Sequence, residues 1–205
     1  AFGKGNHLHL IDGSAFIFRA YHALPPLTRK SDGMPVGAVA GFCNLLWGEL
    51  THARKEAPTH IAVIFDAGSK TFRNDIYPAY KANRPELPED LRPQIGRIRE
   101  MVDVFNIPRL EMEGFEADDV LGSVARLAAE KGLGVKIVTG DRDLLQLVNE
   151  RTAVYLAGDD KNYLSAEDVL KSKFAVRPEQ VVDYKALVGD ASDNIPGVSG
   201  VGEKT

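Results

Sequence analysis

Short apolar runs alternate along the chain with longer amphipathic stretches, and this pattern predicts an α/β fold. Four runs read as buried strands, at residues 7–12, 61–66, 135–141 and 153–157. Two stretches between them, residues 36–56 and 118–131, carry apolar side chains at helical spacing, and Gly132 fits the end of the second helix. Alternating strands and helices are typical of a mostly parallel sheet with helices on both faces.

Residues 67–99 break this pattern. The segment is polar and rich in Pro and Tyr, and it carries seven Lys or Arg residues against four acids. It follows the end of a predicted strand, where α/β proteins place functional loops. We therefore expect this segment to contribute to function rather than to the core.

Composition excludes several classes of protein. Cys43 is the only cysteine, so neither a disulfide framework nor a cysteine metal site is possible. No segment is long enough to span a membrane, and the N-terminus lacks the apolar core of a signal peptide, so the cytoplasm is the expected compartment. The net charge of −4 at first disfavours a nucleic-acid partner.

Acidic residues gather where the predicted strands end. Asp12, Asp66 and Asp141 each close a predicted strand, and ligands of open α/β sheets bind at the carboxyl ends of strands. We expect these three side chains to converge with six further acids, namely Glu116, Asp118 and Asp119 at a predicted helix start, Asp143 after Asp141, and Asp190 and Asp193.

For any single acid in this set, capping a helix N-terminus is the simpler explanation. The whole set indicates a site for Mg²⁺ or Mn²⁺ rather than Zn²⁺, because no His or Cys accompanies the carboxylates. The charge balance then changes: 29 acids minus these 9 leave 20 against 25 Lys and Arg, so the rest of the chain carries +5. A basic body with one acidic pocket suits an enzyme that cuts phosphodiesters.

The motifs of the chain resemble those of the 5′ nuclease domains of bacterial DNA polymerase I, in the flap endonuclease family. The resemblance rests on HLHLIDGSAFIFRAYHALPP, AVIFDAGSKTFRNDIYPAYKANRPELPEDL, GFEADDVLGSVA, TGDRDLLQL and LVGDASDNIPGVSGVGEKT, in this order. It implies a three-layer α/β/α core of the PIN-like type over residues 1–164, with a helical arch at 67–99. A helix–hairpin–helix subdomain would follow at 165–205, cut short where its second helix would begin near Glu203.

The resemblance also implies an activity. Members of the family are structure-specific 5′ nucleases that cut DNA at 5′ flaps, nicks and gaps, with two divalent ions. One ion would be held by Asp12, Asp66, Glu116 and Asp118. The other would be held by Asp141, Asp143, Asp190 and Asp193, with Asp118 as a bridge and Asp119 acting through water. A polymerase region would follow in the full-length bacterial protein.

The same resemblance assigns residues that contact DNA. In the arch, Lys81 would neutralise charge in the transition state, Arg84 would hold a phosphate oxygen, and Tyr80 would stack on a base, or else merely pack. Arg19 and Tyr21 are weaker candidates. The hairpin glycines Gly197, Gly200 and Gly202 would bring backbone amides to a duplex phosphate, with K⁺. Without DNA, the arch and the residues from about Asn194 onward are expected to be loosely held.

Three other functions remain open on the sequence. The chain could be a truncated module that binds DNA without cutting it. It could be a phosphatase with an Asp nucleophile, although that chemistry needs a second acid where this chain has Ser14. A PIN-type ribonuclease would share the acidic edge, but it would need neither the arch nor the glycine hairpin.

Overall fold

The structure is a computed structural model that describes residues 6–157 and 160–204. Within these residues lies a six-stranded sheet in the order β3-β2-β1-β4-β5-β6. Its strands are β1 (His7–Asp12), β2 (His60–Ile64), β3 (Arg109–Leu110), β4 (Gly134–Thr139), β5 (Thr152–Leu156) and β6 (Lys161–Tyr163). Strands β1 to β5 run parallel and β6 is antiparallel, which confirms the mostly parallel sheet.

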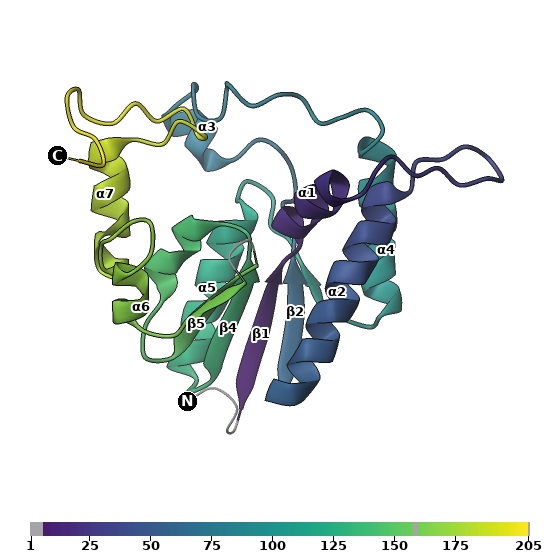
Figure 1. Cartoon of the computed structure of the whole chain (residues 1–205), viewed down its shortest axis with the longest axis horizontal. Coiled ribbons are helices and arrows are strands. Elements are labelled where there is room, and N and C mark those ends of the chain that lie inside the picture. The colour runs from purple at the N-terminus through teal and green to yellow at the C-terminus, as the bar shows by residue number, and fades with distance from the viewer. Residues whose placement is uncertain (1–5, 158–159, 205) are drawn as a thin grey trace.

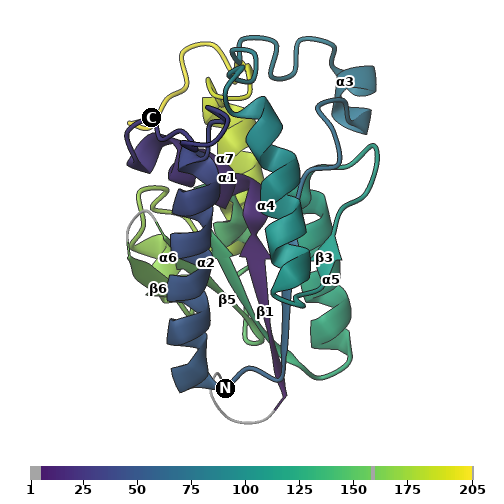
Figure 2. The ribbon, with the colours of Figure 1, turned by 90° about the vertical axis from the view of Figure 1, so that its right-hand side faces the viewer.

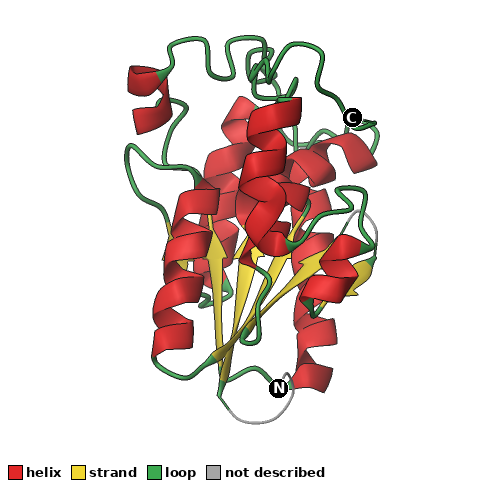
Figure 3. Ribbon diagram, turned by 90° about the vertical axis from the view of Figure 1, so that its left-hand side faces the viewer, coloured by secondary structure: helices red, strands yellow, loops and turns green. Residues whose placement is uncertain are grey.

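Helices cover both faces of this sheet, as Figures 1 and 2 show. One face carries α1 (Gly13–Ala23), α2 (Gly37–Glu56) and α4 (Arg92–Val104), and the other carries α5 (Ala117–Glu130). The remaining elements are short: α3 (Phe72–Ile76), the 3-10 helices η1 (Arg142–Leu147) and η2 (Pro178–Gln180), α6 (Ala166–Leu170) and α7 (Val181–Val188). Figure 3 shows the resulting three layers, as predicted.

The core consists of two apolar clusters, one on each face of the sheet. Alternate residues of β1 supply both: Leu8 and Leu10 pack in the cluster with α5, and Ile11 packs in the cluster with α1, α2 and α4. In the second cluster, the rings of Phe42 and Phe65 stack with centroids 6.0 Å apart. Burying side chains of this size stabilises the fold by roughly 2–3 kcal/mol each, so the ends of β1 and β2 are held rigidly.

One helix and two strands, α4, β3 and β6, were not expected from the sequence. Helix α4 begins inside the range expected for the arch, and Leu91 and Ile98 are fully buried. Residues 92–99 of the expected arch therefore belong to a core helix that packs on α2. This helix was not expected, because arginines are interspersed with its buried residues. The arch itself, now residues 67–91, stays a prediction. The two-residue strand β3 and the short β6 were also not expected.

Residues 1–5 of the expected core domain and Thr205 of the expected hairpin domain lie outside the described residues. Across the part of the chain that is described, no helix combines the length and the apolar character needed to cross a membrane.

Candidate functional site

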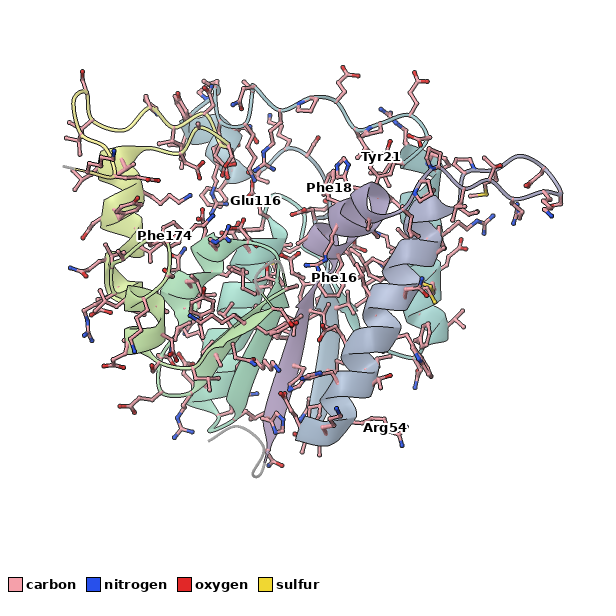
Figure 4. All side chains as sticks on the ribbon, viewed as in Figure 1. Phe16, Phe18, Tyr21, Arg54, Glu116 and Phe174 are labelled. Atoms are coloured by element: carbon pink, nitrogen blue, oxygen red, sulfur yellow. The ribbon has the colours of Figure 1, made fainter. Side chains whose placement is uncertain are left out.

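The carboxyl edge of the parallel sheet brings the strand-end acids together. Asp12 is the last residue of β1, and the strands beside β1 are β2 and β4, which lead to Asp66 and Asp141. The negative charges of both residues act on Asp12, so the three side chains lie near one another at this edge. In Figure 4, Glu116 lies at this end of the molecule and Arg54 at the opposite end.

Asp12 sits at the centre of this edge. Its side chain is 3% exposed, and it accepts hydrogen bonds from the Ala15 amide (2.9 Å) and the Thr139 hydroxyl (2.7 Å). Burial raises the pKa of Asp12 to about 6, despite these hydrogen bonds, and the charges of Asp66 and Asp141 add to the increase. Asp12 thus caps the N-terminus of α1, which is the simpler explanation for a single acid. Capping does not explain why other acids lie around Asp12.

Asp118 is one of three closely spaced acids at the start of α5, and its burial among them is unfavourable. Burial raises the pKa of Asp118 to about 8, and the charges of Asp12, Asp141, Asp66 and Glu116 contribute further. Among the described residues, Asp118 forms no ion pair with Lys or Arg. A buried carboxyl surrounded by four others is unfavourable unless a cation compensates it.

This raised pKa predicts how stability depends on pH when metal is absent. An unfolded aspartic acid, with a pKa of 3.8, is ionised above about pH 5, whereas the folded Asp118 loses its proton only as the pH rises to about 8, so stability falls as pH rises between these two values. The metal-free protein should therefore lose about 1–2 kcal/mol of stability between about pH 6.5 and 8. Calorimetry with a chelator measures this loss. An equally steep loss in Asp118→Asn would contradict the assignment.

Other acids of the set are paired with cations, most of which are distant in the sequence. Glu116 pairs with Lys81 (2.8 Å) and Asp119 with Arg73 (2.6 Å). The remaining pairs are Asp193 with Arg84 (2.5 Å), and Asp143 and Asp190 with Lys185 (2.8 and 2.6 Å). These partners come from outside the immediate flanks of the strand-end acids, because residues 73–84 and α7 fold back onto the carboxyl edge.

The nine predicted acids thus fall into two groups. Five are paired with Lys or Arg as described above, and four form no such pair among the described residues: Asp12, Asp66, Asp118 and Asp141. Nowhere in the described residues are three His, Cys, Asp or Glu side chains arranged closely enough to hold an ion. The chemistry of the four unpaired acids nevertheless fits a hard divalent cation, because they supply oxygen donors and uncompensated negative charge. Side-chain movement would be needed to complete its coordination.

The arch residues contact the acids directly. Tyr80 is 8% exposed, and its hydroxyl lies 3.2 Å from Glu116 Oε2 and 3.1 Å from Asp193 Oδ2. In this structure Tyr80 therefore packs, the alternative that the sequence left open, and its ring is not available for stacking on a base. The Lys81 amide donates to the Asp193 carbonyl oxygen (3.0 Å).

The chain after α7 is held by this same contact. The Asn194 side chain donates to the Ala79 carbonyl oxygen (2.7 Å), and the Tyr77 hydroxyl donates to the Asn194 carbonyl oxygen (3.1 Å). The Val198 amide donates to the Leu187 carbonyl oxygen (2.8 Å). The expectation that residues from Asn194 onward are loosely held is thus wrong for Asn194 to Val198, because the arch and α7 supply partners.

Of the hairpin glycines, two have backbone conformations that favour glycine. Gly197 has φ +66° and Gly200 has φ +81°. A Cβ on Gly197 would come within 2.5 Å of the Gly189 amide nitrogen, so this residue also allows the chain to close onto the end of α7. No left-handed conformation marks Gly202. Contact of these glycines with a phosphate stays a prediction.

A cleft of about 600 Å³ opens beside the carboxyl edge. It is lined by Ala15, Arg19, Gly140, Asp141, Arg142, Asp143, Phe174 and Lys185. The cleft places Arg19 beside the acids, whereas Tyr21 donates a hydrogen bond to Asp90 (2.9 Å) at the foot of the arch. The contacts of Lys185, Phe174 and Arg73 were not predicted, although Lys185 lies only five residues before Asp190 in the sequence.

Family models cover nearly the whole chain. Residues 7–185 match the model described as "5'-3' exonuclease, N-terminal resolvase-like domain", and residues 176–205 match "5'-3' exonuclease, C-terminal SAM fold". The chain is 54% identical over 206 residues to a DNA polymerase I from Rhizobium leguminosarum, covering 98% of this chain and 20% of that protein. It is 45% identical over 198 residues to a 5'-3' exonuclease from Aquifex aeolicus, covering 97% and 66% respectively.

Solved structures show the same fold. The T5 5'-exonuclease with bound zinc superposes with a TM-score of 0.76 at 23% identity, over 97% of this chain and 72% of that one. The catalytic core of Rad2 in complex with DNA superposes with a TM-score of 0.55 at 20% identity, over 96% and 58%. The chain spans about a fifth of the length of the Rhizobium DNA polymerase I and 66% of the Aquifex exonuclease.

Proposed function

The chain belongs to the 5'-3' exonuclease family, and we propose that it is a divalent-metal-dependent 5′ nuclease acting on DNA. Its substrates would be 5′ flaps, nicks and gaps, as in primer removal and repair. The observation that carries this proposal is the buried Asp118, held among Asp12, Asp66, Glu116 and Asp141 at the edge of the sheet. Such an arrangement is unfavourable without a cation and well suited to one.

Asp12, Asp66, Glu116 and Asp118 would hold one ion, with Asp118 as the bridge to a second. Asp141, which the resemblance assigned to the second ion, would join the first, because it forms no pair with Lys or Arg among the described residues. Asp143, Asp190 and Asp193 would help to hold a second, with Asp119 acting through water. When bound, a pair of ions supplies an activated water and stabilises the leaving oxygen. A T5 5'-exonuclease, similar to this chain, binds divalent zinc. The preference for Mg²⁺ or Mn²⁺, and a K⁺ at the Gly197 hairpin, are further parts of the proposal.

Side chains of the protein itself would position the substrate. Thr139 orients Asp12 through its hydrogen bond. Lys81 and Arg84, now paired with Glu116 and Asp193, would turn to a phosphate once a cation compensates those acids. Tyr80 would follow Lys81, because its hydroxyl lies beside the same two acids.

Removal of these arch cations is expected to reduce the cleavage rate. Lys81→Ala and Arg84→Ala should each lower the rate about 10²-fold, because each removes a positive charge next to the reacting phosphate. The melting temperature should change little by comparison, since the two side chains are 25% and 51% exposed. Single-turnover cleavage measures the rate, and Lys70→Ala, whose side chain is 79% exposed, is the matched control. Equal rates for Lys70→Ala and Lys81→Ala would contradict this role.

The proposal is tested by incubating the protein with a 5′-labelled flap DNA in Mg²⁺ or in chelator. Release of short labelled fragments in Mg²⁺ alone is expected. Tight binding without cutting in either condition would instead favour a DNA-binding module. The phosphatase alternative is disfavoured because the position that would need a second acid holds Ser14. The hydroxyl of Ser14 instead accepts a hydrogen bond from the Asp66 amide (2.9 Å). A ribonuclease would cut the matching RNA flap faster than the DNA flap.

The similarity to polymerases suggests a wider setting. Since this chain matches about a fifth of the Rhizobium DNA polymerase I, we propose that its activity accompanies a polymerase region in the same protein. A flap created by strand displacement would then be the natural substrate.

A further inference from the structure

Lys185 occupies an unusual position between two carboxylates of the candidate site. Its ammonium nitrogen lies 2.8 Å from Asp143 Oδ1 and 2.6 Å from Asp190 Oδ2. The two acids come from different segments, η1 and the loop after α7, and the lysine is the link between them. Its position is further supported by the Phe174 ring, whose centroid lies 5.7 Å from the ammonium nitrogen. Figure 4 shows Phe174 on the α7 side of the molecule.

This ammonium is firmly held. Lys185 is 25% exposed, and Asp190 also accepts hydrogen bonds from the Ser192 amide (2.9 Å) and hydroxyl (2.6 Å). Although burial works in the opposite direction, the hydrogen bonds from Lys185 and Ser192 lower the pKa of Asp190 to about 2. An ammonium that bridges two carboxylates provides the compensation that a divalent ion would otherwise provide.

The contrast with the other acids is the second observation. Asp12, Asp66, Asp118 and Asp141 have no such cation among the described residues, so a divalent ion would meet four acids without displacing a partner. Only Glu116, the fifth proposed ligand, would first have to leave Lys81. An ion held by Asp143 and Asp190 would first have to displace Lys185. The third acid of that group, Asp193, is likewise occupied by Arg84 (2.5 Å).

We infer that Lys185 is a resident counter-cation that makes the two proposed metal sites unequal. The first ion binds tightly at Asp12, Asp66, Asp118 and Asp141, and the second binds weakly because it must displace Lys185 from Asp143 and Asp190. This inference rests on the proposed metal-dependent function. Lys185 acts here as a positioning residue. After displacement its ammonium remains in the cleft with Arg19, where a phosphate of DNA can take the place of the carboxylates.

The test is a titration of the metal-free protein with Mn²⁺ alone, without DNA and at constant ionic strength, with free Mn²⁺ followed by electron paramagnetic resonance. The native chain should bind one ion tightly and a second at least about tenfold more weakly. Lys185→Met should tighten the second ion by about tenfold or more and leave the first nearly unchanged. Lys185→Gln keeps hydrogen-bond donors without the charge and should have the same effect. It replaces Lys185→Met in the test if that variant fails to fold.

Two further variants complete the design. Lys185→Arg keeps the bridging charge and should leave the second ion weak. Lys131→Met removes an exposed lysine at the far end of α5 and should behave as the native chain. The inference is overturned if the two ions bind the native chain equally, or if neither neutral variant tightens the second. No Mn²⁺ bound by any variant would overturn the proposed metal-dependent function as well, which separates the two failures.

Discussion

Replacing Asp118 by Asn is expected to lower the cleavage rate about 10³-fold or more while the fold is retained. The amide has nearly the same shape, but it removes the charge that lies among Asp12, Asp66, Glu116 and Asp141. Without metal, folding must either protonate the buried Asp118 or leave its charge uncompensated, and an amide avoids both costs, so the metal-free variant should melt at a higher temperature than the native chain. Single-turnover cleavage of a flap DNA and melting in chelator measure the two effects.

Two comparisons make this prediction specific to the site. Affinity of Asp118→Asn for flap DNA should fall far less than the rate, because binding draws on the basic surface rather than on this carboxylate. Asp183→Asn, on the exposed surface of α7, should leave both rate and melting temperature unchanged. Turnover near the native level in Asp118→Asn would rule out the role of this residue as the bridge between two ions.

Mg²⁺ or Mn²⁺ is expected to raise the melting temperature of the protein strongly. The folded chain gathers acids that the unfolded chain separates, so the ion binds the native state and hardly binds the unfolded one. At an ion concentration of about 100 times its dissociation constant, the gain in stability is about 2.7 kcal/mol. For a domain of this size that corresponds to an increase of roughly 5–10 °C. Calorimetry across a metal titration measures it.

The double variant Asp141→Ala, Asp143→Ala should lose most of this stabilisation, since it removes one acid from each of the two groups. A control variant should lie at the exposed pair of Arg126 and Glu130, which contributes little to stability. Lys136 is unsuitable for this purpose, because it is buried and pairs with Glu56 (2.8 Å). A melting temperature that stays constant through millimolar metal would show that the carboxyl edge does not bind ions.

Much of the fold followed from hydrophobic periodicity. The strands expected at residues 7–12, 61–66, 135–141 and 153–157 agree with β1, β2, β4 and β5 within two residues at each end. The helices α2 and α5 also agree closely. These elements have long apolar faces, which local sequence reveals. Helix α4 was missed because its buried residues are interspersed with arginines, and β3 is too short to have a pattern.

The acids of the site were predictable and their partners were not. Parallel strands end at the same edge, so Asp12, Asp66 and Asp141 had to converge once the strands were recognised. The pairs Arg73–Asp119 and Arg84–Asp193 join residues 46 and 109 positions apart. Such pairs depend on how the arch and α7 pack, which no local pattern encodes. The same reason explains the burial of Tyr80.

The order of strands has a consequence for how this protein matures during synthesis. β1 emerges first from the ribosome, yet it lies between β2 and β4 in the sheet, and Asp12 hydrogen bonds to Thr139, 127 residues later. The carboxyl edge therefore cannot assemble until β4 has been made, and non-local pairings of this kind form slowly. The nascent chain would pass most of its synthesis with its acids apart. The proposed nuclease activity would therefore appear only after almost the whole domain has been translated.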